Sequence, residues 1–260
     1  MVERGVPRRE QVQILNANFD SYTLDSCVEE VVAAATIGER VWLATVNVAI
    51  LMGMRRDREV QDYVDRARWV VADGQPIVWL SKLLGRPLPA RVTGVDLIEG
   101  LCARAEQAGL VVFFLGASDE VVAAAANAMK SRYPRLQLHF DNGYFVDEEA
   151  LERVSAIADA GTNVVFVGMG VPRQERFIEE HLDGMKVNVA IGVGGSFDVI
   201  GGLRGRAPLA LQRFGLEWTY RLVQEPRRLW RRYLVTGTQF GVLALGAVVQ
   251  NRLGRSRRQP

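Results

Sequence analysis

Residues 163–174 have the sequence Asn-Val-Val-Phe-Val-Gly-Met-Gly-Val-Pro-Arg-Gln. The first five residues are mostly β-branched or aromatic, which is typical of a short buried strand. Apolar residues recur at helical spacing over 173–183, so a helix is predicted after a short glycine-containing loop. A strand, a tight loop and a helix in this order form the repeating unit of a parallel α/β sheet.

The same alternation continues on both sides of this stretch. Six strands are predicted, at residues 41–46, 69–72, 110–115, 136–140, 163–167 and 187–191. Helices are predicted between them, at residues 54–68, 94–108, 119–131, 147–160 and 173–183. We therefore expect an α/β fold, with a Rossmann-like, mostly parallel sheet and helices on both faces.

The charge balance changes toward the C-terminal end. Residues 204–260 hold twelve arginines, two acidic residues and no lysine, so this tail has a net charge of +10 and residues 1–203 have −8. Helices are expected over 209–214, over 217–224 and from Pro226 onward. The sequence therefore predicts an α/β domain over 1–203 and a basic, helical, membrane-associating appendage over 204–260.

The tail contains a segment suited to a membrane. Residues 233–251 carry no charge and have arginines on both sides. A helix needs about 20 apolar residues to cross the hydrocarbon core, and flanking arginines can reach phosphate head groups. Three glycines, Gly237, Gly241 and Gly246, weaken this run as a helix. We therefore expect it to lie in the membrane surface, with spanning as the alternative.

Composition disfavours several function classes. Cys27 and Cys102 lie far apart in apolar surroundings, as expected for buried thiols in a reducing compartment. His139 and His181 have no partner at ligand spacing, so we expect no histidine metal site, no Ser-His-Asp site and no cofactor. Residues 1–13 are charged and contain no apolar run, so no secretory signal is expected and the body is expected in the cytosol.

Polar and glycine residues follow the predicted strands. Ligands of parallel α/β sheets bind beyond the carboxyl ends of the strands, so these loops predict a pocket. The loops contain Thr45 and Asn47, Asp73, Tyr144, Gly168, Gly170 and Gln174, and Gly194 and Asp198.

The loop after residue 167 favours an anion. Gly168 and Gly170 let backbone N–H groups approach a ligand closely, and the next helix offers its positive end. Arg173 adds charge and Gln174 adds a neutral donor and acceptor, so a diphosphate fits this loop. The alternative is a tight strand-to-helix turn without a ligand. The loop is neither a Walker A sequence nor a complete dinucleotide fingerprint.

Asp73 is the candidate general base. A carboxylate at the half-desolvated end of an apolar strand has a raised pKa and can accept a proton from a hydroxyl. The alternative is that Asp73 caps the helix that begins near Pro76. Thr45 and Asn47 could bind sugar hydroxyls or cap the next helix. Arg91 is not explained by capping and could pair with a phosphate.

Arginines recur at helical spacing in the tail. Arg221, Arg228, Arg231 and Arg232 fall on one predicted helix face. Tryptophans and tyrosines are interleaved with them, a pattern that suits a membrane interface or nucleic acid. The acidic body argues against nucleic acid, and the uncharged run after Arg232 favours lipid. The alternative is a solvated basic face.

These motifs together resemble the bacterial WecG/TagA/CpsF glycosyltransferase family (glycosyltransferase family 26). The resemblance covers about residues 15–235 and rests on many motifs in the same order. They are Thr-Val-Asn at 45–47, Ala-Asp-Gly at 72–74, Arg-Val-Thr-Gly-Val-Asp at 91–96, Gly-Tyr-Phe at 143–145, Gly-Met-Gly-Val-Pro-Arg-Gln-Glu at 168–175, Gly-Gly-Ser-Phe-Asp at 194–198, Gly-Leu-Glu-Trp at 215–218 and Glu-Pro-Arg-Arg at 225–228.

The resemblance implies a reaction and roles for these residues. It implies metal-independent, inverting transfer of a sugar, N-acetylmannosamine or its uronic acid, from a UDP-sugar to an undecaprenyl-diphosphate-linked saccharide. Asp73 would be the catalytic base. Thr45, Asn47, Arg91 and Gln174 would line the pocket, Tyr144 and Asp198 would contact the nucleotide, and Arg221, Arg228 and Arg231 would meet the diphosphates.

The resemblance also predicts where the protein works. We expect a peripheral enzyme at the cytoplasmic face of the cell membrane, acting in cell-surface polysaccharide synthesis and binding no nucleic acid. Two alternatives stay open: another donor such as UDP-glucose, and a non-catalytic nucleotide-binding protein that docks at the membrane. The oligomeric state is also open, since apolar surface on the body could support a homo-oligomer.

Overall fold

A six-stranded, fully parallel sheet forms the centre of the protein. The computed structural model describes residues 10–256, except the side chains of Leu209, Arg213, Arg228 and 254–256. The strands lie in the order β4-β3-β8-β7-β5-β6. They are β3 (Val41–Val46), β4 (Trp69–Ala72), β5 (Val111–Gly116), β6 (Gln137–Asp141), β7 (Val164–Gly168) and β8 (Val189–Gly192). The predicted sheet is confirmed, with each strand within two residues of its expected bounds.

The strands are apolar throughout because both faces of the sheet are covered. On β7, Val165 and Val167 belong to one hydrophobic core, whereas Val164 and Phe166 belong to the other. Successive side chains of a strand point to opposite faces, so each strand contributes to both cores. Such continuous apolar runs are typical of parallel sheets between two layers of helices.

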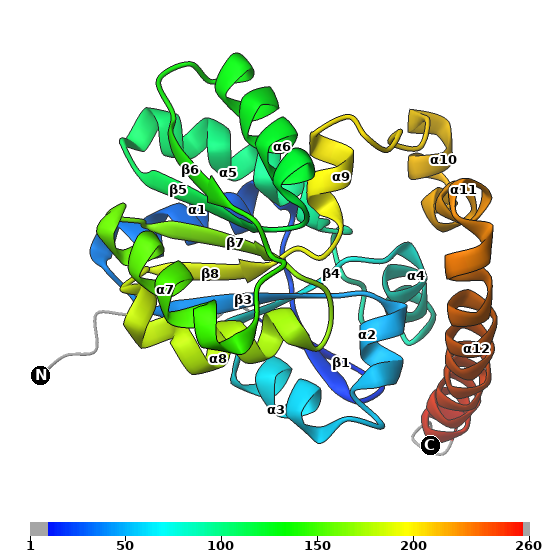
Figure 1. The fold of residues 1–260 in the computed structure, drawn as a ribbon. Helices are drawn as coiled ribbons and strands as arrows, with labels where there is room; N and C mark the ends of the chain where they lie inside the picture. Colours follow the sequence, from blue (N-terminus) through cyan, green and yellow to red (C-terminus); the bar gives the residue numbers. More distant parts are fainter. Residues whose placement is uncertain (1–9, 257–260) are drawn as a thin grey trace, which may run out of the picture.

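Helices cover each face of the sheet, as Figure 1 shows. One core includes residues of α1 (Leu24–Ile37), α5 (Gly94–Ala108), α6 (Asp119–Arg132) and α9 (Ser196–Ile200). The other includes residues of α3 (Arg58–Arg66), α4 (Gln75–Leu83), α7 (Ala150–Asp159), α8 (Arg173–Met185) and the hairpin of β1 (Gln11–Ile14) and β2 (Ala17–Asp20). A short 3-10 turn, η1 (Asp147–Glu149), precedes α7.

The single helix expected over 54–68 is wrong. The chain instead forms α2 (Val48–Gly53) and then α3, which starts after Asp57. The Asp57 carboxylate accepts from the backbone N–H groups of Glu59 and Val60, and such a cap begins a new helix. The hairpin, α1 and the helix bounds of α4 were also not predicted. Thr23 and Ser26 form a capping box that marks the start of α1.

The basic tail is helical, as predicted, and it packs on the body. It contains α10 (Leu209–Arg213), α11 (Glu217–Gln224) and α12 (Pro226–Ser256). Figure 1 shows α12 standing on the side toward which the strands point. One side of α12 lies against α2, and Phe240 on α12 is only 9% exposed. Near the end of α12, Asn251 Nδ2 donates to the carbonyl of Leu84, which follows α4, at 2.9 Å.

The three glycines do not interrupt α12, although helix propensity argues against them. Tertiary packing of one face supplies the stability that glycine removes. The opposite side exposes apolar residues, including Val242, Leu245 and Val249. Leu229–Leu253 is long and apolar enough to cross a membrane by length and composition, with a mean hydropathy of 1.3. The boundary at residue 203 falls in the loop between α9 and α10, and its role as a domain boundary stays a prediction.

Candidate active site

A cavity of about 490 Å³ lies beyond the carboxyl ends of β4, β3, β8 and β7. We call it the glycine-loop cavity. The body lines it with Thr45, Asn47, Asp73, Gly170, Gln174 and Gly194. The tail lines it with Arg204, Arg206, Glu217, Arg221, Glu225 and Arg232. The predicted pocket is thus present at the expected end of the sheet, and the tail forms one of its walls.

Asp73 lies directly after β4 and is half-buried. Its backbone N–H donates to the Val46 carbonyl at 3.0 Å, which fixes the residue beside β3. Asp73 is not a helix cap, because α4 has Gly74 at its N-cap position and no side-chain cap bond. Burial raises the pKa of the Asp73 carboxyl to about 7, although Arg221 and Arg91 act to lower it. A carboxyl with this pKa is suited to general-base work near neutral pH.

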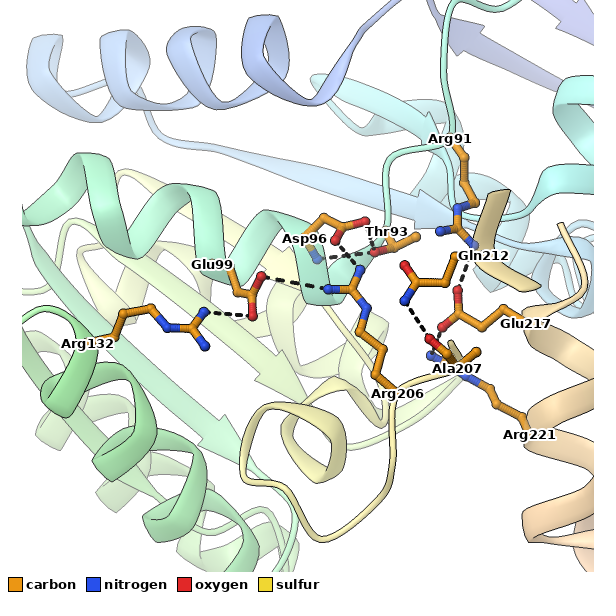
Figure 2. A network of polar contacts seen from close by, with 10 residues as sticks. All are labelled: Arg91, Thr93, Asp96, Glu99, Arg132, Arg206, Ala207, Gln212, Glu217 and Arg221. Carbon is orange, nitrogen blue, oxygen red and sulfur yellow. Dashed lines mark hydrogen bonds and ion pairs between the residues drawn. The ribbon is translucent and has the colours of Figure 1, made fainter. Parts of the chain in front are cut away.

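Glu217 pairs with Arg91 and Arg221, as Figure 2 shows. All three line a cavity together with Asp73. Arg91 Nη1 lies 2.6 Å from Glu217 Oε2, and Arg221 Nη2 lies 3.2 Å from Oε1. Arg91 and Glu217 are mostly buried, with side chains 14% and 12% exposed. The pairing joins the loop before α5 to α11, so it fastens the tail to the body at the site.

Two further arginines of the tail are held by carboxylates. Arg206 pairs with Asp96 and, at 3.7 Å, with Glu99, in the network drawn in Figure 2. Arg204 lies 2.9 Å from Glu225 and 3.4 Å from Asp198. These guanidinium groups are already positioned on the cavity wall. Positioned arginines suit the binding of phosphate oxygens, because the planar guanidinium offers several donors in a fixed geometry.

Thr45 and Asn47 both line the cavity and also have structural roles. Thr45 Oγ1 donates to the Gly192 carbonyl at 2.8 Å, so it ties β3 to β8. Asn47 Oδ1 accepts from the Ile50 backbone N–H at 3.1 Å and caps α2. Capping, one of the two alternatives for these residues, is therefore correct for Asn47. Asn47 nevertheless lines the cavity that also contains Asp73.

Gln174 links the two glycine loops. Its Oε1 accepts from the backbone N–H groups of Gly170, at 3.2 Å, and Gly194, at 3.0 Å. Its Nε2 donates to Glu175 Oε1 at 2.9 Å, and burial raises the pKa of that glutamate to about 7. The expectation that the Gly170 N–H points at an anion is therefore corrected, because this donor is bound to Gln174. The loops are positioned by a buried amide.

Replacing Gln174 with Leu should destabilise the protein. It leaves the Gly170 and Gly194 N–H groups without their acceptor. An unpaired donor shielded from water costs about 1–3 kcal/mol, and the lower end of this range applies here because both glycines are part-buried and line a cavity. We expect a Tm roughly 5 °C lower, which differential scanning fluorimetry measures. The same change at the exposed Gln107 is the matched control, and an equal loss of Tm there would contradict the assignment.

Four other predicted site residues line neither this cavity nor the second cavity described below, whose lining includes Arg91. A side chain at Gly168 would meet the Phe197 ring at 2.7 Å and the Gly194 carbonyl at 2.8 Å, so this glycine permits close packing inside the protein. Tyr144 is 77% exposed in the loop after β6. Asp198 pairs with Arg204 and so reaches the cavity through that arginine. Arg231 is exposed, whereas its neighbour Arg232 lines the cavity.

Arg173 and Arg228 were also predicted to bring positive charge to the site. Arg173 donates to the Phe145 carbonyl at 2.5 Å and stacks over the Phe145 ring at 4.7 Å, so it is directed away from the glycine loops. The Arg228 prediction concerns a side chain outside the described residues. Among the described side chains, no group of three or more His, Cys, Asp or Glu is placed to hold a metal ion.

A second cavity of about 350 Å³ meets the first at Asp73. We call it the aromatic groove, because Trp79, Trp218, Tyr233 and Phe240 line it. It runs between α4, α11 and α12. Asp73, Glu217, Arg221 and Arg232 belong to the lining of both cavities. Of the two carboxylates that line both cavities, Glu217 is paired with Arg91 and Arg221. Asp73, whose pKa is raised to about 7, is therefore the one suited to accept a proton between two substrates, one from each side.

The fold and this site fit a class of enzymes: α/β group-transfer enzymes that bind their substrates beyond the carboxyl ends of the strands. The chain belongs to the WecG/TagA/CpsF family of glycosyl transferases, whose family model matches residues 12–257. The protein is therefore a glycosyltransferase.

Two similar proteins have the same printed name, N-acetylglucosaminyldiphosphoundecaprenol N-acetyl-beta-D-mannosaminyltransferase. One, from Staphylococcus aureus (strain MW2), is 32% identical over 225 residues, which are 85% of this chain and 87% of that protein. Another, from Bacillus spizizenii, is 37% identical over 194 residues, which are 74% of each. Both alignments therefore cover most of either chain.

The residues that were not predicted as site residues are Arg204, Arg206, Glu217 and Arg232. The tail contains only two acidic residues, Glu217 and Glu225. Both pair with arginines that line a cavity. An isolated acid in a strongly basic segment was thus a usable signal for the site, because it marks where arginines are held in place.

Proposed function

We propose that this protein transfers N-acetylmannosamine from a UDP-sugar to N-acetylglucosaminyl-diphospho-undecaprenol, with inversion at the anomeric carbon. The names of the similar Staphylococcus and Bacillus proteins support the transferred sugar and the acceptor. The observation that carries the proposal is the position of Asp73, which lines both cavities and has a pKa of about 7.

Asp73 accepts the proton of the acceptor hydroxyl. As the proton leaves, the hydroxyl oxygen attacks the anomeric carbon of the donor and the bond from that carbon to the diphosphate oxygen breaks. The products are the new glycosidic bond, UDP and protonated Asp73. A single displacement of this kind inverts the anomeric configuration, because the nucleophile enters opposite the departing diphosphate.

Arginines stabilise the departing diphosphate. Arg221 and Arg232 line the cavity beside Asp73, and Arg204 and Arg206 lie farther along the same wall. Negative charge grows on the diphosphate as its bond to the sugar breaks, and prepositioned donors at that place lower the barrier. Charge-assisted hydrogen bonds from guanidinium to phosphate are among the stronger polar interactions in proteins.

The exposed apolar side of α12 supports attachment of the protein to a membrane. The outward side of α12 exposes Leu234, Val242, Leu245, Val249 and Leu253, and the opposite side packs on the body. An exposed apolar stripe on a helix that is tied along a folded domain fits a surface-lying helix. We infer that the enzyme binds peripherally to the cytoplasmic face, where its lipid acceptor is held.

A screen of UDP-sugars tests the function. Purified protein is mixed with an N-acetylglucosaminyl-diphospho-lipid and each of UDP-N-acetylmannosamine, its uronic acid form, UDP-N-acetylglucosamine and UDP-glucose, and released UDP is measured. We expect release with UDP-N-acetylmannosamine that depends on the acceptor. Release with UDP-glucose alone would replace the donor assignment. Nucleotide binding without release from any donor would support a non-catalytic protein instead.

A further inference from the structure

The aromatic groove has two chemically different ends. Its inner end contains Asp73 with Arg91, Arg221 and Arg232, and its outer part contains Trp79 and Trp218. A ligand that fits both ends has an anionic head and an apolar body. Only the flat base of a nucleotide could stack on these rings, whereas its sugar and phosphates are polar and do not match the rest of the outer part.

The outer part exposes apolar surface that the protein itself does not cover. Trp79 on α4 is 43% exposed and Trp218 on α11 is 42% exposed. Trp218 packs edge-on against Tyr233 of α12, with ring centroids 5.9 Å apart. Phe240 of α12 is nearly buried and joins this surface to the hydrophobic core. Adjacent exposed aromatic side chains are typical of binding sites for apolar groups.

Two glycines shape the groove: Gly215 allows close packing of its wall, and Gly237 leaves open space. Gly215 has φ +66°, and a side chain there would come within 2.8 Å of the Trp79 ring, so the loop before α11 packs closely on α4. A side chain at Gly237 of α12 would meet no atom within 4 Å, although Gly237 lines the groove. The bare helix backbone at Gly237 therefore leaves space that a larger residue would fill.

We propose that the aromatic groove binds the first isoprene units of the acceptor lipid while the arginines at its inner end bind the acceptor's diphosphate. This inference rests on the proposed function. The groove volume of about 350 Å³ is at the small end of ligand sites, which span about 300–1,000 Å³. It accommodates the start of a polyprenyl chain only. The remaining chain continues past the exposed face of α12 into the bilayer.

Binding of prenyl diphosphates in solution distinguishes a ligand site in this groove from general attachment of the protein to a membrane. We would measure the Kd of dimethylallyl diphosphate, with one isoprene unit, and farnesyl diphosphate, with three, by titration calorimetry without vesicles or detergent. Each buried methylene strengthens binding roughly fourfold, so we expect farnesyl diphosphate to bind at least about tenfold more tightly. Equal affinities would overturn the inference.

Gly237→Leu provides the decisive variant, because it fills the groove from α12. It should remove the farnesyl preference and leave the Kd of dimethylallyl diphosphate unchanged. Gly246→Leu is the matched control: it lies nine residues later, roughly half a turn around the helix at about 100° per residue, and outside the groove. Loss of the preference in both variants would contradict the assignment. Trp79→Ala, which removes an exposed ring, should weaken farnesyl binding without filling the groove.

Turnover measurements test the groove assignment and the proposed function separately. Acceptors that carry N-acetylglucosamine on dimethylallyl or farnesyl diphosphate should show the same tenfold preference in KM, with UDP release as the readout. Farnesyl-selective binding without UDP release from any donor would contradict the proposed function and leave the groove assignment standing. Release at equal KM with both acceptors would support the function and overturn the groove assignment.

Discussion

Asp73→Asn should reduce turnover by about 10²–10⁴-fold, the range expected when a general base is lost. The amide has nearly the same shape as the carboxyl but cannot accept the acceptor's proton at neutral pH. Under the proposed function UDP binds at the glycine loops and the arginines, so its binding should persist. UDP release measured with saturating donor and acceptor, together with calorimetric UDP binding, checks both parts. Unchanged turnover would exclude Asp73 as the base.

The wild-type pH profile provides a second check on Asp73. Activity requires the carboxylate form, and the Asp73 pKa is about 7, so kcat/KM should fall tenfold per pH unit below about 7. An acid limb near pH 4, the range of an ordinary carboxyl group, would contradict the assignment. The Asn variant should retain no such limb in its residual activity.

Asp73→Asn should also stabilise the fold above neutral pH. Burial raises the pKa of Asp73 in the folded protein, so the charged form is less favourable in the folded state than in the unfolded chain. The wild type therefore loses stability as pH rises from about 4, the usual carboxyl pKa, to about 7, and the neutral amide does not. We expect Asp73→Asn to raise the Tm by a few degrees at pH 8, and to change it little at pH 4.

Arg221→Ala should lower kcat/KM by roughly 10–100-fold, because hydrogen bonds to charged groups contribute about 1.5–3 kcal/mol each. It should also move the acid limb of the pH profile upward, since Arg221 acts to lower the pKa of Asp73. A merely structural arginine would not shift this limb. Steady-state kinetics across pH measure both effects.

Neighbouring arginines serve as matched controls for Arg221. Arg227 is exposed on the same tail and lines neither cavity, so Arg227→Ala should leave kcat/KM within about twofold. Arg232→Ala should lower it more than Arg231→Ala, because only Arg232 lines the cavities. Equal losses in all four variants would indicate a general charge effect on membrane binding.

The sheet could be predicted because both of its faces are buried. Each central strand, such as Val164–Gly168, is an apolar run that glycines or polar residues end. The α2–α3 break could not be read from periodicity, because residues 55–59 are all charged and carry no apolar spacing that favours either one helix or two. Only the Asp57 cap marks the start of α3. The β1–β2 hairpin was missed because each of its strands has only four residues.

The site was predictable to the level of loops but not of side-chain direction. Asp73 could be chosen because strand ends gather at one edge of a parallel sheet, and Arg91 because capping of the helix after it does not explain it. Gln174 has the expected place, yet its amide is bound to two backbone N–H groups and a glutamate. The choice between Arg231 and Arg232 depends on how α12 is rotated against α2. The spacing of residues within α12 alone does not determine this rotation.

The residues that line the two cavities come from two separate parts of the chain, and this has a consequence for engineering. The base and the glycine loops come from residues before 200, whereas the arginine wall and one side of the aromatic groove come from residues after 203. A single crossover in the loop between α9 and α10 would thus exchange the arginine wall and one side of the aromatic groove between homologous enzymes. Chimaeras made this way could combine one enzyme's donor selectivity with another's lipid selectivity, provided that the Arg91–Glu217 pair is kept.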